Sequence, residues 1–140
     1  MADPTTLGSY TVESVIFRGQ IATSYLAAHT VMRGQRVVLR VLNPEAAADK
    51  DRVARFETEA RNAARLKHEC IAGVVDLQRD GDSPFLVLEY AEGLDVSTLL
   101  STFGAMPPTV AGVIAREVLR GLEHAHGLGM MHSKLRPRRV

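Results

Sequence analysis

Short runs rich in β-branched and aromatic residues recur through the first ninety residues of the chain. These runs span residues 10–16, 24–29, 36–42, 72–78 and 85–89. Runs of this composition are typical of β-strands. The turn sequences at residues 33–35 (RGQ) and 80–82 (DGD) each join two neighbouring runs, so both indicate hairpins. We therefore expect five strands in an antiparallel sheet.

A helical period interrupts this strand pattern once. Residues 45–66 carry apolar side chains on one stripe and charged side chains on the opposite face, which is the pattern of a surface helix. The stripe consists of Val53, Phe56, Ala60, Ala63 and Ala64. A single helix is therefore expected between the third and fourth strands.

Helices also follow the last strand. A short one is indicated by Val96, Leu99 and Leu100, and a longer one begins at Pro107-Pro108, because proline is tolerated in a first helical turn. Gly127 and Gly129 are expected to end the longer helix. Its apolar stripe is formed by Val110, Ile114, Val118, Leu122 and Ala125. The pattern as a whole predicts an α+β protein, a sheet unit followed by a helical one.

Composition narrows the class of protein further. The chain has 140 residues, of which 46% are hydrophobic and 24% charged, a balance typical of globular domains. The net charge of +1 gives no global attraction to nucleic acid or to membranes. No apolar run approaches the roughly 20 residues that span a bilayer, and the first residues lack a signal-peptide pattern. With one cysteine, Cys70, a reducing cytoplasm and a buried structural thiol are expected.

Three segments resemble a known family in both order and spacing. They are residues 56–68 (FETEARNAARLKH), residues 85–93 (FLVLEYAEG) and residues 121–132 (GLEHAHGLGMMH). They are similar to the bacterial (Hanks-type) serine/threonine protein kinases. The resemblance implies a kinase small lobe and hinge over residues 1–92 and the beginning of the large lobe over residues 93–140. It also places Leu88 at the gatekeeper position.

The positions that hold nucleotide in this family are altered here. In the glycine-rich loop (residues 17–24, FRGQIATS), Gly19 alone stands at a motif glycine, whereas Ala22 and Phe17 replace the other two. The lysine that holds the α- and β-phosphates corresponds to Arg40, for which an ion pair with Glu59 is expected. Guanidinium is larger than ammonium and forked, so this exchange is not conservative.

Further candidate contacts for a nucleotide are implied by the resemblance. These further contacts are Glu89 and Ala91 in the hinge. The full set of candidate nucleotide contacts is therefore Gly19, Ala22, Arg40, Glu59, Glu89 and Ala91. A plain turn without a ligand remains the simpler interpretation of residues 17–24. We therefore expect no bound cofactor.

The catalytic loop departs most from the family pattern H-R-D-L-x-x-x-N, because the chain reads H-S-K-L-R-P-R-R over residues 132–139. Lys134 stands where an aspartate orients the attacking hydroxyl, and a lysine ammonium has no lone pair with which to accept a proton. Arg139 stands where an asparagine binds magnesium. The family's D-F-G motif is not among these residues, so no magnesium site is expected within them.

These replacements predict a catalytically inactive, pseudokinase-like module that acts as a scaffold or regulatory domain. Its expected partner is another protein or a second copy of the chain, bound through the long helix. The alternatives are a fragment of an ATP-binding serine/threonine kinase and a sensor that binds ATP without turnover. A metal site at His124, His126 and His132 has poor ligand spacing. The basic residues 134–139 lack the interleaved aromatics of a nucleic-acid site.

Overall fold

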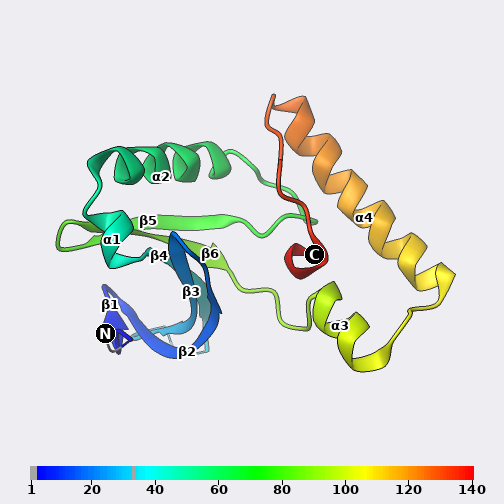
Figure 1. Cartoon of the computed structure of the whole chain (residues 1–140), viewed down its shortest axis with the longest axis horizontal. Coiled ribbons are helices and arrows are strands. Elements are labelled where there is room, and N and C mark those ends of the chain that lie inside the picture. Colours follow the sequence, from blue (N-terminus) through cyan, green and yellow to red (C-terminus); the bar gives the residue numbers. More distant parts are fainter. Residues whose placement is uncertain (1–2, 33) are drawn as a thin grey trace. The chain divides into compact units, whose positions relative to one another are not determined.

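The structure is a computed structural model that describes residues 3–32 and 34–140 (Figure 1). The chain divides into two compact units. The first comprises Met1–Arg65 and Ala72–Tyr90, and the second comprises Leu66–Ile71 and Ala91–Val140. The short segment 66–71 thus belongs with the C-terminal part of the chain, although a helix and a strand of the first unit, residues 50–63 and 74–80, precede and follow it in sequence.

The first unit is built on an antiparallel sheet. Within the described residues it has six strands in the order β1-β2-β3-β4-β6-β5. The strands are β1 (Thr6–Leu7), β2 (Tyr10–Arg18), β3 (Ala22–His29), β4 (Arg36–Leu42), β5 (Val74–Asp80) and β6 (Ser83–Glu89). All five expected strands are present. The additional strand β1 was not expected, since a two-residue strand is too short to show a periodic pattern.

Both expected hairpins form. β3 and β4 pair from Ala28↔Arg36 onward, and the connection turns through Gly34, whose φ of 89° favours glycine. Arg33 of the expected turn lies outside the described residues. In the second hairpin Asp80 pairs with Ser83, and Gly81 has φ 57°.

The expected single helix over residues 45–66 is in fact two, α1 (Pro44–Ala47) and α2 (Lys50–Ala63). Asp49 separates them, because its side chain accepts hydrogen bonds from the backbone N–H groups of Asp51 and Arg52 and so begins a new helix. Phe56 and Ala60 of the expected stripe are buried. Ala64, which follows the helix, is exposed.

Two apolar clusters lie on the two faces of the sheet. One contains Leu39, Phe85 and Val87 with their neighbours from β1 to β3. The other joins Leu42 and Leu86 to α1 and α2, so α2 covers this face of the sheet (Figure 1). Val37 and Leu39 of β4 belong to the first cluster and Leu42 to the second, whereas in β6 the successive residues 84–87 are all buried because both faces of this strand are covered.

The second unit contains α3 (Val96–Phe103), α4 (Pro108–Gly127) and a 3₁₀ turn, η1 (Pro137–Arg139). Asp95 caps α3 by accepting hydrogen bonds from the N–H and the hydroxyl of Thr98, and these bonds lower the pKa of its carboxyl group. The backbone N–H of Val96 donates to the carbonyl of Val140 at 3.0 Å, which ties the end of the chain to α3. None of the helices in the described residues is long and apolar enough to span a bilayer.

Candidate nucleotide-binding and catalytic positions

One face of the sheet gathers several of the positions expected to contact a nucleotide. Arg40 of β4 lies opposite Ser24 of β3 on one side and Leu86 of β6 on the other. Val38 lies opposite Leu88, the expected gatekeeper. Directly opposed residues of an antiparallel pair point to the same face, so the strand register alone brings these side chains together.

The geometry of the turn between β2 and β3 explains why position 19 is a glycine, and no ligand is needed for that explanation. The N–H of Gly19 donates to the carbonyl of Ala22 at 3.0 Å, and a Cβ at position 19 would lie 2.8 Å from that same oxygen. Closure of the turn therefore requires glycine for steric reasons alone. Ala22 itself is buried in the apolar cluster beneath α2, whereas Phe17 is 44% exposed at the end of β2.

One ion pair between the helix α2 and the sheet involves a residue that sequence reasoning missed. Glu57 on α2 pairs with Arg79 on β5, and also with Arg61 one helical turn further at 3.2 Å. Glu59 is exposed on α2, and Arg40 is half-buried on β4. The Arg40–Glu59 pair stays a prediction. The spacing of Glu57 and Arg61 is a helical i,i+4 signal, but nothing local to it points to Arg79.

The hinge candidate Glu89 has a structural partner in Gly73. The N–H of Gly73 donates to Glu89 Oε2 at 2.9 Å, and the N–H of Glu89 donates to the Gly73 carbonyl at 2.9 Å. The carboxylate thus holds the entry to β5 against the end of β6. Ala91, the other hinge candidate, is exposed and belongs to the second unit.

The loop after α4 presents cations to solvent. Residues 131–140 contain four Lys and Arg residues and no Asp or Glu, and Lys134 and Arg139 are both exposed. The N–H of Lys134 donates to the carbonyl of His132 at 2.7 Å, which closes a tight turn around Ser133. Ser133 has φ 59°, a backbone conformation that costs a non-glycine residue about 1 kcal/mol or more.

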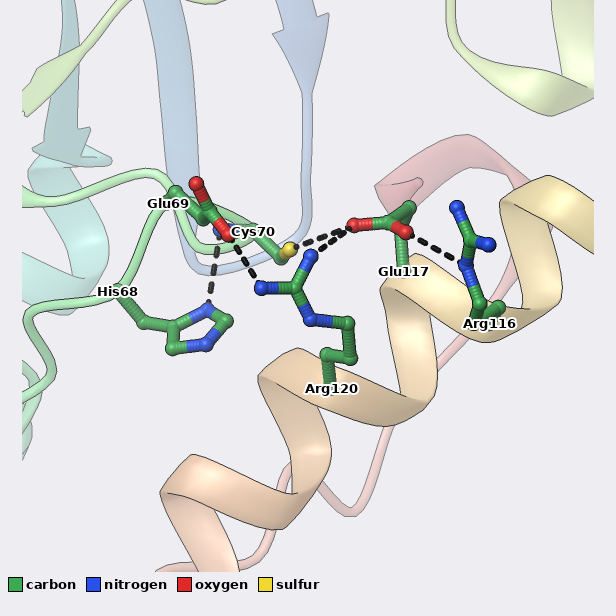
Figure 2. A network of polar contacts seen from close by, with 6 residues as sticks. All are labelled: His68, Glu69, Cys70, Arg116, Glu117 and Arg120. Atoms are coloured by element: carbon green, nitrogen blue, oxygen red, sulfur yellow. Dashed lines mark hydrogen bonds and ion pairs between the residues drawn. The ribbon is translucent and has the colours of Figure 1, made fainter.

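A network of polar contacts fastens the segment 66–71 to α4 (Figure 2). The Cys70 thiol donates to Glu117 Oε2 at 3.3 Å, and Arg120 bridges the carboxylates of Glu117 and Glu69. Arg116 Nε donates to the other oxygen of Glu117 at 2.9 Å. The network therefore joins residues that lie almost fifty positions apart in the sequence.

Cys70 in this network is half-buried, less enclosed than the sequence suggested. Burial and the Glu117 carboxylate raise the pKa of its thiol, which favours the protonated donor. The same hydrogen bond, together with those from Arg116 and Arg120, lowers the pKa of Glu117. The protonated thiol and ionised carboxylate fit a structural hydrogen bond better than a reactive cysteine.

Two of the four histidines of the second unit, His68 and His124, form a ring contact with their planes tilted by 31°. The rings of His68 and His124 lie 5.1 Å apart, and His124 Nε2 is buried without a hydrogen-bond partner in the described residues. His68 Nδ1 accepts from the N–H of Cys70 at 3.1 Å. In the part of the chain that the structure describes, no three His, Cys, Asp or Glu side chains are grouped so that they could hold a metal ion.

The curled antiparallel sheet with α2 on one face, and the helical unit whose loop follows α4, define a protein-kinase-like class of fold. A family model described as the protein kinase domain matches residues 10–140, so the chain belongs to the protein kinase domain family. The α+β, kinase-like fold expected from the sequence is confirmed.

The similar proteins include bacterial serine/threonine kinases. PknL of Mycobacterium tuberculosis is 36% identical over 131 residues, which cover 94% of this chain and 33% of PknL. PrkC of Bacillus subtilis is 29% identical and matches 95% of this chain and 20% of PrkC. The crystal structure of the PknI kinase domain of Mycobacterium tuberculosis aligns with a TM-score of 0.75 at 30% identity, covering 99% of this chain and 58% of that one. The chain thus spans a third or less of these curated relatives.

Proposed function

We propose that this chain is a pseudokinase-like module that works in the cytoplasm as a scaffold or regulatory interaction domain and does not transfer phosphate. The observation that carries the proposal is the lysine at position 134, where the kinase motif has its aspartate. That aspartate accepts the proton of the attacking hydroxyl, and an exposed ammonium group offers only donors.

Arg139 also supports the proposal, because it is unfavourable for magnesium binding. The asparagine at this motif position holds a magnesium ion that neutralises charge on the phosphates. A guanidinium group there brings a second positive charge to the place of a cation, and like charges repel. Two replacements thus act against the acid–base step and the metal together, while Arg40 alters the phosphate contact on the sheet.

The first test is phosphoryl transfer. Purified protein incubated with radiolabelled ATP, magnesium and a generic acceptor protein is expected to give no label above the protein-free blank. PknL, assayed in parallel, serves as the positive control. Magnesium-dependent transfer that disappears in Lys134→Ala would contradict the proposal. The double variant Arg40→Lys with Lys134→Asp shows whether restoring the motif residues restores any transfer.

The interaction role rests on the exposed apolar surface of α4. The stripe expected from the sequence is mostly covered, because Ile114, Val118 and Leu122 are half-buried and Ala125 is buried. A different strip of α4, the one around Leu119, is exposed to solvent, and Leu119 itself is 64% exposed. Around it lies a shallow hollow of about 700 Å³, lined by Gly112, Ala115, Leu119 and Leu122 and also by the polar or charged side chains of Arg116, Arg120, Glu123 and His126. We propose that a second copy of the chain covers this strip, since association removes apolar area from water.

Light scattering tests this self-association. The wild-type chain is expected to show about twice the mass of one chain, because the C₂ dimer is by far the commonest soluble homo-oligomer. Leu119→Glu is expected to be monomeric, because dimer formation would bury an unpaired carboxylate in the interface. Val31→Glu is the matched control, because Val31 is 80% exposed in the first unit. A monomeric wild type, or equal loss of mass in both variants, would refute the role of α4.

The second candidate function is that of one part of an ATP-binding serine/threonine kinase. It is supported by the 36% identity to PknL and by the cation kept at Arg40. Thermal shift with millimolar ATP, with and without magnesium, distinguishes three possibilities. The inactive scaffold is expected to show no shift, a sensor without turnover shows a shift that does not depend on magnesium, and a kinase shows one that does.

A further inference from the structure

Asn43 occupies a position from which it reaches the glycine-containing turn. It follows β4 directly and precedes α1, as the residue at the N-cap of that helix. An asparagine at an N-cap normally accepts a hydrogen bond from the first helical turn. The Asn43 side chain makes no such bond, so its amide is used elsewhere.

The amide instead joins both sides of the turn between β2 and β3. Asn43 Nδ2 donates to the carbonyl of Gly19 at 2.9 Å, and Asn43 Oδ1 accepts from the hydroxyl of Thr23 at 2.8 Å. The backbone N–H of Asn43 donates to the carbonyl of Ile21 at 2.8 Å. One residue thus contacts the beginning, the tip and the end of the turn.

The Thr23 contact makes this arrangement specific. Thr23 is 6% exposed and is the one buried polar residue among those that the structure describes, so its hydroxyl needs a partner. Asn43 Oδ1 is that partner, and this orients the amide with Nδ2 toward Gly19. A carboxylate at position 43 would still accept from Thr23 but would place an oxygen against the Gly19 carbonyl, so only an amide satisfies both neighbours.

We propose that Asn43 is a positioning residue that latches the turn at residues 19–22 to the end of β4. The latch holds the turn in one place in the absence of any ligand. Movement of this turn, which a nucleotide-covering loop would need, then requires three hydrogen bonds to break together. This inference concerns the loop itself and holds whether or not the chain transfers phosphate.

Amide hydrogen exchange on the full chain tests the latch. In Asn43→Ala the Gly19 amide is expected to exchange about tenfold faster or more, because two side-chain hydrogen bonds are lost. Amides in the centre of β4 and β6, such as those of Leu39 and Val87, are expected to keep their protection. Asn62→Ala, an exposed change on α2, is the matched control and leaves Gly19 unaffected.

Two variants at Thr23 decide the result if Asn43→Ala fails to fold. Thr23→Val removes the hydroxyl at nearly constant volume and is expected to speed Gly19 exchange, whereas Thr23→Ser keeps the hydroxyl and the slow exchange. Gly19 exchange in folded Asn43→Ala within about twofold of wild type would overturn the proposal, since tenfold corresponds to the loss of roughly one hydrogen bond. Equal exchange in Thr23→Val and Thr23→Ser would overturn it as well.

Discussion

Replacing Phe85 with alanine is expected to lower the free energy of unfolding by about 3–5 kcal/mol. Phe85 is completely buried at the centre of the first apolar cluster, together with Leu39 and Val87. β6 is hydrogen-bonded to a strand on each side, so Phe85 lies opposite Val41 and also opposite Gln78. The neighbouring backbones cannot close the cavity without breaking these ladders. Urea denaturation followed by circular dichroism measures the loss.

Phe103→Ala is the matched control for this change. Phe103 lies on α3 and is 73% exposed, so its removal is expected to change stability by no more than about 0.5 kcal/mol. Equal losses in the two variants would contradict the assignment of the core. The same cavity is also expected to disturb the face that carries Arg40, because Arg40 lies opposite Leu86, the next residue along β6.

Strands were the part of the fold most readily predicted from sequence. The run at residues 36–42 matches β4 residue for residue, and its alternation places Val37 and Leu39 in the core. This strand contributes residues to the clusters on both faces of the sheet, so its nearly continuous run of β-branched and aliphatic residues is itself the signal of a buried strand. The other predicted strands are correct to within about two residues at each end, the usual uncertainty of hydrogen-bonded element ends.

The division of residues 45–66 into two helices has a local signal in the sequence. The apolar positions of α1 and α2 share one stripe, so periodicity alone joins the two helices. Asp49 before Lys50 is an N-cap residue, and the structure uses it as one. The capping residue Asp49, in addition to the hydrophobic period, therefore marks where residues 45–66 divide into α1 and α2.

Contacts between distant residues could not be predicted. The bond from Cys70 to Glu117 joins residues 47 positions apart, and the latch joins Asn43 to Gly19 across 24 positions. Neither residue's local sequence indicates its partner, because the pairing depends on strand register and on where a segment crosses a helix.

The altered catalytic loop could be recognised for a different reason. Whether a side chain accepts a proton depends first on its chemical type, so Lys134 in place of aspartate can be interpreted before any coordinates. The structure adds that this loop is exposed and turns tightly at Ser133. It adds no carboxylate within residues 131–140 that takes the place of the missing one.

Replacing Gly121 on α4 with a large residue is also expected to destabilise the protein strongly. Gly121 is buried, and a Cβ there would lie 3.2 Å from the Cys70 carbonyl oxygen and 3.2 Å from Ile71 Cγ1. Gly121→Leu is expected to cost about 1–3 kcal/mol, because the added side chain forces the segment 66–71 away from the helix. The displacement also breaks the bond from Cys70 to Glu117, which exposes the thiol and relieves the burial that raises its pKa.

Thiol modification makes this prediction specific to the second unit, because Cys70 is the only cysteine of the chain. In Gly121→Leu a thiol reagent at pH 8 is expected to react several-fold faster with Cys70 than in the wild type, since more of the thiol is ionised and accessible. Gly127→Leu is the matched control on the same helix, where a Cβ meets no atom within 4 Å. There the lost glycine is expected to raise helix stability by up to about 1 kcal/mol, and Cys70 reactivity stays unchanged. Unchanged reactivity in Gly121→Leu would show that the segment 66–71 is not held against α4 at this residue.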